Sequence, residues 1–179
     1  MEKNIGIDAA NFALSTTFQI TVPGNYNHPT QLASFARKNR RKFYIFRKFY
    51  IYNDNITDAN FAKATNQLTP GKTYGVKIFQ ITKQVTSEDC LAFLKTQKAI
   101  LVGAQGISVV WQQAKENFPK GEYTVSFDEK NACWQDADGD YRVPYLYRDL
   151  DGDWIFRLGV FEFGWCGGEY VLCVRDLSA

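Results

Sequence analysis

Apolar and polar residues alternate through most of the last third of the chain, between residues 122 and 176. The alternation runs through five segments: 123–127, 132–135, 141–148, 154–158 and 170–174. A period of two places the apolar side chains of a strand on one face. Asp138-Gly139 and Asp151-Gly152 lie between these segments. Asp-Gly pairs are typical of tight hairpins, because Gly accepts a positive φ without a steric clash. The pattern predicts a C-terminal antiparallel β-meander of about five strands.

Short helical and strand patterns alternate over the first two-thirds of the chain. Strand patterns occupy 16–22, 74–81 and the apolar run 99–102, and helical patterns occupy 29–42, 57–67, 86–98 and 107–118. The strand at 74–81 has apolar residues on both faces, which is typical of a central strand. These short elements, followed by the meander, predict an α+β fold.

Two threonines mark helix starts. Thr57 is a good N-cap, and Ile56 and Phe61 are spaced to form a hydrophobic staple around it. Thr86 and Asp89 have the spacing of a capping box, with Asp in place of the usual Glu. Both signals predict a helix that follows directly.

A tandem hexamer stands out in the first half. Arg41-Lys-Phe-Tyr-Ile-Phe46 is followed at once by Arg47-Lys-Phe-Tyr-Ile-Tyr52. Because six is even, both copies present the same side chains to the same faces of a strand, so we expect one strand or two here. Cations interleaved with exposed rings can bind single-stranded nucleic acid. The alternative is a buried aromatic strand whose Lys and Arg side chains reach solvent.

Charge divides unevenly between the two parts of the chain. Residues 1–120 carry a net charge of +9 and residues 121–179 a net charge of −7, within an overall +2. Such asymmetry marks either a basic surface for an anionic partner or two halves that attract each other. The candidate partner-binding residues are Arg37, Lys38, Arg40, Arg41, Lys42, Arg47 and Lys48.

The acidic turns resemble the start of a calcium loop. Asp136, Asp138 and Asp140 recur thirteen residues later as Asp149, Asp151 and Asp153. The sixth and twelfth positions of a calcium loop, Gly and Glu, are absent from both copies, so we expect turn formers without a metal. The alternative is that the six carboxylates hold a divalent ion for phosphodiester cleavage.

Other chemistry is sparse. The only histidine, His28, lies in a loop rich in Pro and Asn, and we expect it to be exposed. No Cys-x-x-Cys pair occurs among Cys90, Cys133, Cys166 and Cys173, which argues against structural zinc. The two glycines at 103 and 106 lack the Lys-Ser/Thr of a phosphate loop and are interpreted as a tight turn.

Several distinctive motifs occur between residue 68 and the C-terminus. They are Val102-Gly-Ala-Gln-Gly106 leading to Trp111, Phe118-Pro-Lys-Gly121, Ser126-Phe-Asp-Glu-Lys130, Trp134-x-Asp-Ala-Asp-Gly139, Arg142-Val-Pro144, and Leu158-Gly-x-Phe-Glu162 leading to Trp165. Together they resemble those of a family of small uncharacterised bacterial proteins. The resemblance implies a bacterial cytoplasmic origin and no catalytic residues. Residues 1–67 then form a variable N-terminal extension on a core domain at 68–179, and the two can pack as one unit.

The sequence therefore predicts a non-enzymatic binding module that engages a nucleic acid or an anionic protein surface. No nucleophile, base and metal ligand occur at a recognisable catalytic spacing. No run approaches eighteen apolar residues, and the N-terminus lacks a signal peptide pattern, so we expect a cytoplasmic protein with free thiols and no membrane partner. We expect no cofactor.

Overall fold

The computed structural model describes residues 8–43 and 52–178, and these ranges form a mixed sheet with helices on both faces. The strands are β1 Phe12–Thr21, β2 Thr73–Ile81, β3 Tyr123–Val125, β4 Trp134–Gln135, β5 Tyr141–Arg148, β6 Trp154–Val160 and β7 Tyr170–Asp176. The α-helices are α1 Gln31–Asn39, α2 Ser87–Thr96 and α3 Gly103–Ala114. Short 3-10 turns cover Ala9–Asn11, His28–Thr30, Arg40–Lys42, Lys115–Asn117, Lys130–Ala132 and Phe161–Phe163. The predicted α+β class is confirmed.

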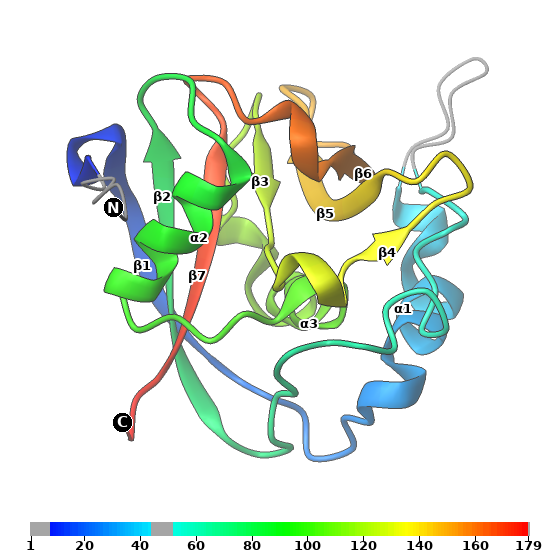
Figure 1. Ribbon diagram of the computed structural model, residues 1–179. Coiled ribbons are helices and arrows are strands. Elements are labelled where there is room, and N and C mark those ends of the chain that lie inside the picture. The colour runs from blue at the N-terminus through cyan, green and yellow to red at the C-terminus, as the bar shows by residue number, and fades with distance from the viewer. Residues whose placement is uncertain (1–7, 44–51, 179) are drawn as a thin grey trace.

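The strand order is β1-β2-β7-β3-β5-β4, and β6 also pairs with β5. All described pairs are antiparallel except β3 with β7. The last third of the chain supplies five strands, as predicted, but they do not form a simple meander: β3 pairs with β5 and β7 instead of β4, and the last strand leaves the hairpin series. It crosses back to lie between β2 and β3, where Figure 1 shows it running through the middle of the sheet.

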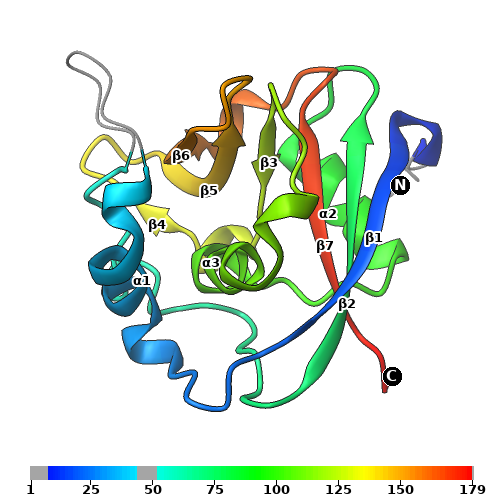
Figure 2. The same cartoon turned by 180° about the vertical axis from the view of Figure 1, so that it is seen from behind.

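Helices cover both faces of the sheet because its central strands are apolar on both sides. Val76 and Ile78 of β2 join one core cluster with α1 and α3, and Phe79 and Ile81 join the other with α2. Figure 1 shows α2 lying across β2 and β7, and Figure 2, seen from behind, brings α3 to the front. The prediction that β2 is a central strand is confirmed.

Residues from the predicted extension 1–67 share the core of the later chain. Phe35 of α1 lies 5.4 Å from Trp111 of α3 and 5.7 Å from Phe156 of β6, measured between ring centroids. Ile20 and Phe61 belong to the same buried cluster. In addition, β1 pairs with β2 over its length. Burying aromatic rings of this size contributes strongly to stability, so the N-terminal segment is part of the same folded core.

The helix predicted over 57–67 does not form. Thr57 caps a single turn, with a bond from Phe61 N–H to the Thr57 carbonyl at 3.2 Å, and residues 58–63 are turns. Continuing the helix would require Thr65 N–H to donate to the Phe61 carbonyl, four residues back. Gln105 Nε2 donates to that carbonyl at 3.1 Å, while Thr65 N–H donates to the Asp128 carboxylate at 3.1 Å. Side chains from other elements therefore replace the helical bond.

Two smaller expectations also change. The apolar run 99–102 makes one bridge, between Ile100 and Val174, in place of a strand. Gly103 and Gly106 do form a turn, but it is the first turn of α3: Gly103 N–H donates to the Phe127 carbonyl, and Gly106 N–H to the Val102 carbonyl.

None of the helices in the part of the chain that the structure describes has the length and apolar character that a bilayer crossing requires.

Candidate functional site

A cleft of about 440 Å³ lies between the C-terminal end of α1 and the C-terminal end of α3. Lys38, Lys42 and Lys115 line it, and no Asp or Glu is among its lining residues. The other lining residues are Pro23, Asn25, Tyr26, Gln31, Ser34, Asn39, Trp111, Gln112 and Gln113. The three lysines are exposed, whereas Trp111 is only 2% exposed and lies at the bottom. The cleft therefore has a cationic rim and a polar interior.

Two of the lysines come from adjacent elements. Lys38 is in the last turn of α1, Lys42 ends the 3-10 turn Arg40–Lys42 that follows it, and both side chains line the cleft. Asn39 between them is 5% exposed and turns inward. Cations at the end of a helix also offset the partial negative charge of its last carbonyls. That stabilising role is the competing explanation for these lysines.

The third lysine comes from a distant part of the chain. Lys115 follows directly after α3, and its Nζ lies 5.3 Å from the centroid of the Trp111 ring. The Trp111 Nε1–H is buried and has no acceptor among the described residues. An indole N–H can only donate a hydrogen bond. The rim of the cleft thus offers ammonium donors above a buried indole ring.

The Gln31 amide ties α1 to α3 inside the cleft. Its Nε2 donates to Ser108 Oγ and to Gln112 Oε1, both at 2.9 Å. Because these bonds join the two helices directly, the walls of the cleft are held at a fixed spacing.

The remaining predicted basic residues are placed differently. Arg40 pairs with the Asp54 carboxylate and lies over the Tyr52 ring at 5.6 Å. Arg37 and Arg41 are exposed and lie outside the cleft lining. Arg47 and Lys48 lie outside the described residues. Lys38 and Lys42 are therefore the members of the predicted set that line the cleft.

The described ends of the hexamer repeat are buried. Phe43 and Tyr52 are 2% and 5% exposed, and each makes a parallel bridge to β6, to Trp154 and Phe156 respectively. Their rings pack in the aromatic cluster around Phe35. These two rings are core residues, which is the alternative that the sequence left open. The rest of the proposed strand, residues 44–51, lies outside the described part of the chain.

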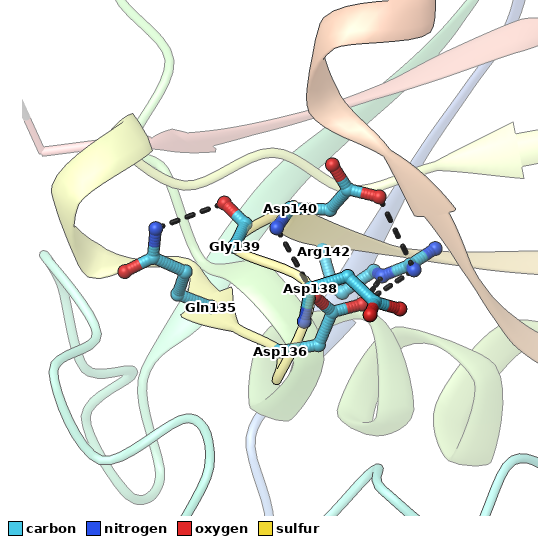
Figure 3. A network of polar contacts seen from close by, with 6 residues as sticks. All are labelled: Gln135, Asp136, Asp138, Gly139, Asp140 and Arg142. Atoms are coloured by element: carbon cyan, nitrogen blue, oxygen red, sulfur yellow. Dashed lines mark hydrogen bonds and ion pairs between the residues drawn. The ribbon is translucent and has the colours of Figure 1, made fainter.

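The first acidic turn is closed by its own residues, as Figure 3 shows. Asp136 Oδ1 accepts from the N–H groups of Asp138 and Asp140 at 3.0 Å each, and Oδ2 accepts from Arg142 Nε at 2.6 Å. Partial burial pushes the pKa of Asp136 upward, but the Arg142 guanidinium and these N–H donors together outweigh it and lower the pKa. Asp136 thus caps the turn as a carboxylate.

The second acidic turn repeats the design at the other end of β5. Asp149 Oδ1 accepts from Asp153 N–H at 2.7 Å, and Gly152 has a φ of +96°. The eight residues of β5 separate the two turns by about 25 Å. Among residues 8–43 and 52–178, no three His, Cys, Asp or Glu side chains gather closely enough to hold a metal ion. The geometry gives the metal-dependent alternative no support.

The prediction that His28 is exposed is wrong. His28 is 6% exposed, and its Nδ1 lies 2.8 Å from the Tyr26 hydroxyl. The short turn at His28–Thr30 folds the ring inward, where burial lowers its pKa although the Asp58 carboxylate opposes this. The four cysteines are free thiols, and Cys166 is exposed whereas the other three are buried.

Sequence reasoning missed Trp111 and Lys115 as site residues. Trp111 belongs to the apolar stripe of α3, which indicated core packing. No local pattern connects Lys115 with α1, because more than seventy residues separate them.

Comparison of the chain with protein-family models, with curated proteins and with solved structures gave no match. The resemblance to small bacterial proteins therefore stays a prediction.

Proposed function

We propose that the protein is a non-enzymatic binding module that holds the phosphate backbone of single-stranded nucleic acid in the lysine-lined cleft. One observation carries the proposal: three lysines line the cleft, and no carboxylate is in its lining. Phosphate oxygens carry negative charge and accept hydrogen bonds, so they complement the ammonium groups of the lysines.

Sequence composition around the cleft supports an anionic ligand. No Asp or Glu occurs between Asp8 and Asp54, a stretch that includes α1 and the whole hexamer repeat. A long stretch of one charge sign raises the local concentration of oppositely charged partners. Binding through the backbone also agrees with the burial of Phe43, Tyr52 and Trp111, which leaves these rings unavailable for stacking on bases.

The experiment is a salt titration of binding to a fluorescently labelled single-stranded oligonucleotide of mixed sequence, followed by anisotropy. Each phosphate contact with single-stranded nucleic acid contributes about 0.7 to the slope of log affinity against log salt concentration. Replacing Lys38, Lys42 and Lys115 with Gln removes three contacts. We expect the slope of this triple variant to be smaller by about 2 and its affinity at low salt to fall at least tenfold.

The matched control carries the same change at Lys63, Lys95 and Lys120, which are exposed and lie outside the cleft. It loses the same net charge but should keep most of the slope. The proposal is wrong if the wild-type protein does not bind at low salt, or if the two triple variants lose affinity equally.

A further inference from the structure

A second pocket, of about 420 Å³, lies beside the 3-10 turn His28–Thr30. Its lining residues are His28, Pro29, Asp58, Ala59, Ala62, Gln67 and Gln105. His28 and Gln105 are 6% and 1% exposed and lie at the bottom, while Pro29, Ala59, Ala62 and Gln67 are exposed at the rim. Small-molecule sites in proteins commonly have this size and this mixture of apolar walls and a few buried polar groups.

Two polar atoms of the buried lining residues have no hydrogen-bond partner among the described residues. They are Nε2 of His28 and Oε1 of Gln105. The Gln105 amide is held in one orientation because its Nε2 donates to the Phe61 carbonyl at 3.1 Å, which leaves the oxygen free. Buried polar groups are normally paired, since an unpaired one costs free energy. Two such groups in one pocket point to a ligand.

The neighbouring Tyr26 hydroxyl determines whether His28 Nε2 is a hydrogen-bond donor or acceptor. Burial raises the pKa of Tyr26, so the hydroxyl keeps its proton. Its partner in the described part of the chain is His28 Nδ1, at 2.8 Å. If the hydroxyl donates to Nδ1, both atoms are satisfied and the hydrogen of the neutral ring sits on Nε2. In the other tautomer the buried hydroxyl proton would lack an acceptor. The pocket therefore presents an N–H donor from His28 and a C=O acceptor from Gln105.

We propose that this pocket binds a neutral, flat carboxamide or cyclic amide, whose C=O accepts from His28 Nε2–H and whose N–H donates to Gln105 Oε1. The Asp58 carboxylate in the lining disfavours an anionic ligand, and the side chains of Pro29, Ala59 and Ala62 provide apolar contacts for a ring. The site differs from the lysine-lined cleft in its residues and in the charge that it favours, so this proposal does not depend on nucleic-acid binding.

The test uses the fact that His28 is the only histidine of the chain. An untagged protein labelled with ¹⁵N then gives one imidazole in a long-range ¹H–¹⁵N spectrum, which reports the tautomer directly. Nicotinamide serves as the carboxamide probe, uracil as the cyclic amide probe and nicotinate as the matched anionic control. We expect a ring protonated at Nε2 and a saturable shift with nicotinamide or uracil. Nicotinate should shift it at least tenfold more weakly, because it lacks the N–H and carries a charge.

Two variants test the assigned hydrogen bonds. His28→Phe and Gln105→Met each remove one bond to the ligand, and we expect each to weaken probe binding about tenfold in calorimetry. Gln19→Met, a change at an exposed position of β1, should bind the probes like wild type. The proposal is overturned if neither neutral probe gives a saturable shift in the wild-type spectrum, or if nicotinate binds as tightly as nicotinamide. The wild-type measurement decides the matter even if a variant fails to fold.

Discussion

The segments that follow Thr86 and Thr57 begin in the same way and end differently. Thr86 Oγ1 accepts from Asp89 N–H at 3.0 Å, and Thr57 Oγ1 accepts from Asn60 N–H at 3.2 Å. After Thr86 the chain continues as α2 for ten residues, whereas after Thr57 it makes one turn. A satisfied N-cap starts a helix, but the following carbonyl and N–H groups must also find each other before the helix can continue.

The two segments differ in the hydrogen-bond partners of the backbone C=O and N–H groups that follow the N-cap. In α2 the Asp89 carboxylate accepts a hydrogen bond from Thr86 N–H at 2.9 Å, and this bond completes the capping box within the helix. After Thr57, the Gln105 amide donates to the Phe61 carbonyl, and the Asp128 carboxylate accepts from Thr65 N–H. A buried side-chain acceptor can compete with a helical bond because each backbone group needs only one good partner. Tertiary contacts thus decide between the two outcomes.

The largest expected effect comes from removing the acceptor that interrupts the second segment. Asp128 is 4% exposed and accepts from the N–H groups of Thr65 and Glu129. Asp128→Ala should lower the free energy of unfolding by about 3 kcal/mol, because both N–H groups lose a buried charged acceptor and the packed carboxylate is removed. Urea denaturation measures the loss. Asp138→Ala, on an exposed turn, is the control and should cost less than about 0.5 kcal/mol. Equal losses in both variants would remove Asp128 from the explanation.

Removing the capping hydroxyl of Thr86 or Thr57 should have a smaller effect on stability. Thr86→Ala should cost about 1 kcal/mol of unfolding free energy, because it opens a capping box on a helix of ten residues. Thr57→Ala should cost roughly half of that, because this exposed hydroxyl caps a single turn. Thermal unfolding of both variants gives the ranking, and Thr→Ser at each position keeps the hydroxyl as a control. The reverse ranking would mean that the cap at Thr57 carries more structure than its single turn suggests.

The smallest effect concerns pH. Burial raises the pKa of Asp128 above its usual value, although the N–H groups of Thr65 and Glu129 oppose this. The folded protein therefore binds the proton more readily than the unfolded chain, whose Asp titrates at about 3.9. Asp128 contributes stability below that pH and loses the contribution as pH rises through its folded pKa. The stability of wild type relative to Asp128→Asn should fall between pH 4 and pH 7 in urea titrations. A difference that is constant or rises would contradict the assignment.

Local patterns were enough to predict the parts of the fold that depend on neighbours in sequence. The period of two in β2 and β5, and the capping box at Thr86, each involve side chains a few residues apart. The parallel pairing of β3 with β7 joins segments more than forty residues apart, and the interrupted helix after Thr57 depends on residues more than forty further along. Neither contact leaves a periodic signal in the sequence.

The candidate site divides in the same manner. Lys38 and Lys42 were predicted because they belong to a run of cations at the end of a predicted helix, and both line the cleft. Lys115 and Trp111 could not be found, since only the packing of α3 against α1 brings them to the cleft. His28 was expected to be exposed because its sequence neighbours are typical of loops. The bond to Tyr26, two residues away, turns it inward.

The position of β7 has a consequence for biosynthesis. This strand of seven residues links the half-sheet β1-β2 to the half-sheet that contains β3, and it is the last of the seven to leave the ribosome. Until it emerges, β2 and β3 each present an open edge, and such edges readily pair with other nascent chains. A polysome translating this sequence would thus hold many incomplete sheets close together, each of them still without β7.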